Sequence, residues 1–163
     1  MKLNRLLFNN KGYVLEGDID FSNEEFDGYH LRKINSCHVY ITGQEFEDLL
    51  MLDVKIESNV TGVCAYTLED VPLDLKIHEN IEISDTVEDD DVIFYEKNAV
   101  FDIDPYILSL IVANVPNKII KKGAKLPSSG KGYRVLSEEE YNKEQENKVD
   151  PRWAALDNLD LDK

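Results

Sequence analysis

Alternation of apolar and polar residues governs the first hundred residues, and this pattern most limits the folds open to the chain. It is strictest over residues 71–78, whose odd-numbered positions are all Val, Leu or Ile. Similar spacing occurs over 13–21, 36–42, 49–57 and 60–66. A period of two gives each strand one buried and one solvated face, which is typical of antiparallel sheets. Connections long enough for crossover helices are missing, so parallel pairing is not expected.

Two short strands, over 92–95 and 99–101, are predicted next, and helices follow them. Asp104-Pro105 is a helix start, because Asp caps free N–H groups and Pro is tolerated at the first helical position. Apolar residues on nearly all sides of the helix that begins there predict that it is buried. Pro116 ends it.

The remaining residues predict two more helices. Ser137 and Glu140 have the spacing of a capping box, which opens a polar helix. Asp150-Pro151 repeats the earlier start signal before a last helix with an apolar stripe.

A chain of 163 residues fits one domain and can bury about 70% of its unfolded surface. We therefore predict a single α+β domain over 1–163. Residues 1–101 are mainly β and form an antiparallel sheet, open or barrel-like. Residues 102–163 supply about three helices and a polar loop over 117–134.

The overall charge excludes some classes of partner. The chain has 18 Lys and Arg against 33 Asp and Glu, a formal net charge of −15. Such a balance argues against a generally basic nucleic-acid binder and against adsorption to anionic membranes, and it favours basic partners. Two cysteines make no disulfide framework, and no apolar run is long enough for a signal peptide or a membrane span. A cytoplasmic location is expected.

Local motifs for catalysis or cofactor binding are missing. Cys37 and Cys64 belong to no C-x-x-C pair, and we expect them to be buried as small apolar residues. The segment 129–132 lacks the glycine and the hydroxyl residue of a phosphate-binding loop. We therefore predict no catalytic, cofactor or metal residues. The alternative is an enzyme whose site forms only in three dimensions.

Charge is segregated along the chain. Residues 117–134 carry six bases and no acid, and the remainder carries a net −21. Residues 82–91 carry six acids and no base. Either these runs are solvated or paired with one another, or the surface is bipolar, with the loop touching RNA phosphates and the acidic body holding a basic protein. The bases of the loop are Lys118, Lys121, Lys122, Lys125, Lys131 and Arg134.

Arg152 and Trp153 follow the last helix start. Trp153 either anchors that helix on the core, with Arg152 as a surface charge, or the two residues contribute to a contact surface, where both types are enriched.

Several stretches of the sequence resemble one family. Residues 130–141 (GKGYRVLSEEEY) and 150–156 (DPRWAAL) look like the family's C-terminal end. Residues 63–71 (VCAYTLEDV) resemble its central signature, and 104–116 resembles its apolar helix ending in proline. The family is YceD, the bacterial large ribosomal RNA subunit accumulation proteins, and the likeness is greatest to its low-GC Gram-positive branch.

The chain departs from the family pattern at the cysteines. Many members have Cys-x-Arg-Cys-Leu in the central signature; here Cys64 and Leu68 match, but Tyr66 and Thr67 replace Arg and the second Cys. The second cysteine pair of such members is also missing from 115–132. Metal binding through paired cysteines is therefore not expected.

The resemblance implies a non-enzymatic role in the synthesis, processing or stability of 23S rRNA. The implied partners are a ribosomal protein, a 23S rRNA precursor, or both. The alternative is an acidic adaptor that binds protein and makes no RNA contact.

Overall fold

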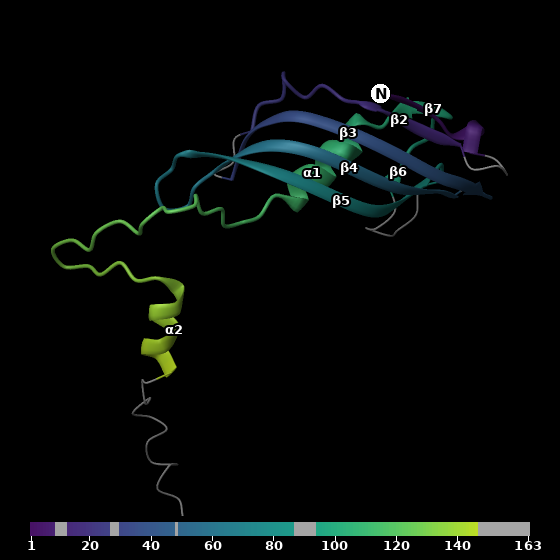
Figure 1. Ribbon diagram of the computed structural model, residues 1–163. Coiled ribbons are helices and arrows are strands. Elements are labelled where there is room, and N and C mark those ends of the chain that lie inside the picture. The colour runs from purple at the N-terminus through teal and green to yellow at the C-terminus, as the bar shows by residue number, and fades with distance from the viewer. Residues whose placement is uncertain (9–12, 27–29, 48, 87–93, 147–163) are drawn as a thin grey trace, which may run out of the picture. The chain divides into compact units, whose positions relative to one another are not determined.

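The computed structural model describes residues 1–8, 13–26, 30–47, 49–86 and 94–146 (Figure 1). Its elements, in chain order, are β1 (Lys2–Asn4), the 3₁₀ helix η1 (Arg5–Phe8), β2 (Val14–Asp18), β3 (Leu31–Phe46), β4 (Leu49–Val63), β5 (Asp70–Ser84), β6 (Phe94–Tyr95), β7 (Val100–Asp102), α1 (Asp104–Asn114) and α2 (Glu138–Glu146). The mixed α+β class predicted from the sequence is therefore confirmed.

The chain divides into two compact units. The first unit, Met1–Lys121, holds all the described strands and α1, and the second, Lys122–Lys163, holds α2. That the chain forms a single domain stays a prediction. The last predicted helix, beginning at Asp150, lies outside the described residues, so the described part of the chain contains two α-helices.

The main sheet of the first unit is open, with the strand order β2-β3-β4-β5-β6. The described strands do not close a barrel, since β2 and β6 stay at opposite ends of that order. A second sheet pairs β1 with β7. Among the described strands, pairing is antiparallel except between β5 and β6, where Ile83 and Ser84 pair in parallel with Phe94 and Tyr95. The expectation of purely antiparallel pairing was wrong at this short pair, which is too short to give a periodic signal.

Three long strands form the centre of the sheet. The stretch 36–42 is the middle of β3, and the pattern over 49–57 that continues over 60–66 forms one strand, β4, which ends at Val63. The β4–β5 register runs without a bulge from Leu49 opposite Ser84 to Val63 opposite Asp70. Alternate residues of β4 are consequently buried, as the pattern predicted.

Helix α1 lies against one face of this sheet, here called the inner face (Figure 1). Its Ile107 and Ile111 are fully buried and belong to one core cluster with Val54 and Ile56 of β4. The opposite face, here called the outer face, carries the exposed alternate positions of the strands. A sheet with one packed and one solvated face accounts for the period-two pattern.

Helix α1 differs from its prediction in two ways. Its N-cap position is Ile103, which makes no side-chain cap, and Asp104 is already helical. It is also only partly buried, because Val112 is 48% exposed. Val112 is therefore at the surface, although the prediction placed it in the core. No helix among the described residues is long and apolar enough to cross a membrane.

Candidate functional site

The predicted basic segment 117–134 is divided by the boundary between the two units, which falls after Lys121. Lys118 and Lys121 belong to the first unit, and the other four bases belong to the second. The two groups of bases belong to different units, so each group is described separately.

In the first unit, the basic segment is attached to the turn between β4 and β5. Ile119 forms a parallel bridge with Cys64, and its carbonyl accepts a hydrogen bond from the N–H of Ala65 at 2.7 Å. The Nζ of Lys121 pairs with Glu69 at 3.1 Å, and the Nζ of Lys118 lies 5.9 Å from the ring centroid of Tyr66. Both lysines are thus engaged by the protein itself, which reduces what they can offer a ligand.

The second unit holds the remaining described bases. Arg134 pairs with Glu144 at 2.6 Å, and both side chains are exposed. Within the described part of the chain, Lys122, Lys125 and Lys131 have no ion-pair partner and all three are exposed. These three lysines are the most available cations of the predicted segment.

The capping box of α2 is confirmed in the second unit. The N–H of Glu140 donates to the Ser137 hydroxyl at 3.1 Å, and the N–H of Ser137 donates to the Glu140 carboxylate at 2.8 Å. The bond from the Ser137 N–H, and a second one from the Ser137 hydroxyl to the same carboxylate at 2.9 Å, hold the pKa of Glu140 below its usual value. Arg152 and Trp153, the other predicted contact residues, lie outside the described residues.

Both cysteines are free, and both are buried as predicted, but Cys64 is not simply an apolar residue, because its sulfur accepts a backbone hydrogen bond. Burial raises the pKa of Cys37 to about 12. The pKa of Cys64 is lowered to about 7, chiefly because the N–H of Lys121 donates to its Sγ at 3.3 Å. Among the described residues, no three His, Cys, Asp or Glu side chains are grouped to hold a metal ion.

Polar side chains form rows across the outer face of the sheet. One row runs through Asp18, His38, Glu57 and Lys76, which stand opposite one another on β2 to β5. His38 contacts Asp18 at 2.7 Å and Glu16 at 3.3 Å, and the hydrogen bond to Asp18 is the main reason why its pKa is raised. The row is a ladder of opposite charges exposed to solvent.

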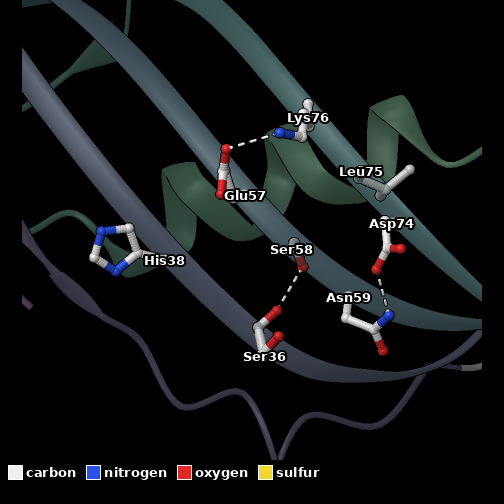
Figure 2. A pocket seen from close by; sticks show the side chains of 8 residues that line it. All are labelled: Ser36, His38, Glu57, Ser58, Asn59, Asp74, Leu75 and Lys76. Carbon is white, nitrogen blue, oxygen red and sulfur yellow. Dashed lines mark hydrogen bonds and ion pairs between the residues drawn. The ribbon is translucent and has the colours of Figure 1, made fainter.

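A shallow hollow of about 360 Å³ lies on this outer face (Figure 2). Figure 2 shows Lys76 reaching toward Glu57, at 3.1 Å, and Asn59 toward Asp74, at 2.6 Å. The charged side chains of the hollow are exposed, so it offers solvated charges rather than a desolvated catalytic group. The lining residues are Ser36, His38, Glu57, Ser58, Asn59, Asp74, Leu75 and Lys76.

The sequence alone did not predict that these polar residues form one surface on the outer face. Alternation identifies its members, because Asp74, Lys76 and His78 occupy the polar positions of β5. It cannot tell which residues of β3 and β4 stand beside them, since that depends on the register. The acids are not confined to residues 82–91 either: the first unit has 24 Asp and Glu against 10 Lys and Arg.

Comparison with known proteins gives two matches. The model of a family described as large ribosomal RNA subunit accumulation protein YceD matches residues 52–160. A curated relative, the uncharacterized protein YlbN of Bacillus subtilis (strain 168), is 35% identical over 138 residues, which cover 79% of this chain and 77% of the relative. No solved structure matches the chain.

Proposed function

The chain belongs to the YceD family, the large ribosomal RNA subunit accumulation proteins, and we propose that it promotes 23S rRNA accumulation or large-subunit assembly by binding, without catalysis. Its partners are a basic ribosomal protein, the 23S rRNA precursor, or both. The family match carries this proposal, because nothing in the strand pattern or the charge alone points to a ribosome. The working place of such a factor is the cytoplasm, where ribosomal subunits are assembled in bacteria.

The charge of the first unit supports a basic protein partner. It has 24 Asp and Glu against 10 Lys and Arg, a formal net charge of −14. Such a field attracts a basic protein and repels nucleic acid. Ribosomal proteins must bind RNA phosphates, so basic surfaces are common among them.

The second unit supports an RNA contact. Lys122, Lys125 and Lys131 are exposed and have no ion-pair partner among the described residues. Arg134 belongs to the same contact, although it shares its charge with Glu144. Lys118, Lys121, Arg152 and Trp153 complete the proposed partner-binding set.

Replacing three lysines tests the RNA contact. We expect that Lys122→Ser, Lys125→Ser and Lys131→Ser together weaken binding to a 23S rRNA fragment. The slope of log affinity against log salt should become less steep by about 2 to 3, because each phosphate contact releases about 0.7 to 0.9 counterion. The control combines Lys118→Ser with Lys121→Ser, which should change the slope by less per lysine replaced, because both lysines are already engaged. Unchanged slopes in the triple variant would remove these lysines from the mechanism.

Depletion in the host tests the function itself. We expect 23S rRNA to fall relative to 16S rRNA, and the wild-type protein to restore the ratio. An unchanged ratio would refute a role in 23S accumulation whatever the protein binds.

A second candidate, a protein adaptor without RNA contact, is favoured by the engagement of Lys118, Lys121 and Arg134 within the protein. It predicts affinity for one basic partner and none for rRNA alone. Restoration of the 23S to 16S ratio by the triple-serine variant would favour this adaptor.

A further inference from the structure

Strand β5 has one paired edge and one largely open edge. Strand β4 pairs with it along its whole length, from Asp70 to Ser84. On the other side, β6 pairs only with Ile83 and Ser84. Within the described residues, the stretch from Asp70 to Glu82 therefore has no strand on its second side.

The direction of the backbone groups along this open edge follows from one hydrogen bond. The carbonyl of Ser84 accepts from the N–H of Glu96 at 2.8 Å, on the side of β6. In a regular strand the N–H and C=O of one residue point to the same side, and this side alternates along the strand. Since the β4–β5 register has no bulge, even-numbered residues of β5 point their backbone groups to the open edge. The open N–H and C=O groups of the central stretch are those of Asp74, Lys76, His78 and Asn80.

Pro72 agrees with this assignment. It is even-numbered, so its missing N–H would have pointed to the open edge, where proline breaks no ladder bond. An edge left open in this way is a template for an added strand.

Apolar side chains beside the edge are incompletely covered. Leu73 and Leu75 are only partly buried, whereas their cross-strand neighbours Val60 and Ser58 are 0% and 4% exposed. A strand added to β5 would place its own inward side chains next to Leu73 and Leu75 and cover them.

Charge selects the kind of strand that fits. Residues 69–85 contain six Asp and Glu against one lysine, Lys76, which is itself paired with Glu57 (Figure 2). A second copy of this edge would bring like charges together, and RNA phosphates would be repelled. A lysine- and arginine-rich segment is attracted.

We propose that the open edge of β5 binds an extended, basic segment of a partner protein, which adds to the sheet as a further strand opposite Asp74–Asn80. The segment alternates apolar residues, facing Leu73 and Leu75, with Lys or Arg residues near Asp74. Its backbone pairs with the open groups of the even-numbered residues. The proposal rests on the proposed function, because it gives the basic ribosomal partner a place and a binding mode.

A synthetic peptide tests the pairing directly. The probe is a ten-residue peptide of alternating Lys and Val. Its control has the same sequence with alternate backbone nitrogens methylated on the pairing side, which keeps charge and side chains but removes the donors. We expect the probe to bind the full chain at least tenfold more tightly than the control. It should also slow amide exchange of Lys76 and His78 at least tenfold, as measured by NMR. Equal binding of the two peptides, or amides already protected in the free protein, would overturn the proposal.

Edge variants separate backbone pairing from charge. Lys76→Pro removes one open N–H without touching the β4 ladder, and it should weaken probe binding about tenfold. Lys76→Gln removes the same positive charge but keeps the N–H, and it should bind the probe at least as well as wild type. His78→Pro repeats the test at a second open position. Preserved binding in both proline variants, or displacement of the probe by a poly(A) oligonucleotide acting at β5, would refute strand addition.

The peptide assay and the depletion experiment test the edge proposal and the proposed function separately. If the probe does not pair with β5 but depletion still lowers 23S rRNA, the edge proposal is wrong and the proposed function stands. If the probe pairs but depletion leaves the 23S to 16S ratio unchanged, the proposed function is wrong and the edge is a binding site for another basic partner.

Discussion

Ile111 provides a quantitative test of how α1 is seated on the inner face of the sheet. Its side chain is fully buried in the core cluster. Ile111→Ala removes three carbon atoms, worth about 0.8 kcal/mol each in transfer free energy. The cavity left behind adds to this loss, so we expect unfolding to become easier by about 3 kcal/mol. For a chain of this size, such a loss corresponds to a fall in Tm of about 6 to 12 °C.

Urea denaturation followed by circular dichroism measures this loss, and the neighbouring Val112 supplies the control. Val112 is 48% exposed, so Val112→Ala removes little buried surface. The better helix propensity of alanine compensates for about 0.5 kcal/mol of that loss. We expect its stability to stay within about 0.5 kcal/mol of wild type, with the same m value in both variants. Equal losses from the two substitutions would refute the packing of α1 described above.

Three further predictions concern individual side chains. His38 should titrate above the pKa of a free imidazole in an NMR titration, and Asp18→Asn should lower its pKa. Because the pKa of His38 is raised in the folded protein, the pair stabilises the fold at pH values below the ordinary histidine pKa. This stabilisation is lost as the pH rises through the pKa of the folded protein, so Asp18→Asn should make stability depend less on pH over that range. Cys64 should show thiolate absorbance at 240 nm with a midpoint near pH 7, absent in Cys64→Ser. Its pKa is lowered, so its contribution to stability grows as pH rises above about 7 and is lost below that value; a midpoint near 9 would contradict the Lys121 hydrogen bond. Ser137→Ala should destabilise α2 by about 1 kcal/mol, seen as faster amide exchange in that helix alone.

The sequence was a good guide to strands whose alternation is unbroken and a poor guide where polar residues enter a strand. The alternation is recognised over 49–57 and again over 60–66, and the polar residues Ser58 and Asn59 between these two stretches are assigned to neither. In the structure Ser58 is buried within the strand, and its hydroxyl donates to the carbonyl of Ser36 at 2.8 Å. A hydroxyl satisfied in this way costs little when buried, and only the neighbouring strand reveals its acceptor.

Composition separates the basic segment from the acidic remainder, but that this segment is a binding site stays a prediction. Composition could not show that Lys121 meets Glu69, 52 residues away, or that Lys118 lies over Tyr66. Such pairs depend on the tertiary fold, and no spacing rule within the segment encodes them. The open edge of β5 was equally invisible, because alternation defines the faces of a strand and not its neighbours.

The strength of the RNA contact determines how much of the binding affinity each of the two proposed partners provides. Three available lysines release about two to three counterions, so raising salt from 50 to 200 mM should weaken RNA binding about 20- to 40-fold. The net −14 of the first unit opposes RNA further. A contact made by three lysines alone is weak at physiological salt, so we expect most of the affinity to come from the proposed basic protein partner. At 150 mM salt, immobilised protein should therefore retain a 23S fragment only when a bound basic ribosomal protein accompanies it. Equal retention of naked RNA would show that the RNA contact extends well beyond Lys122, Lys125 and Lys131.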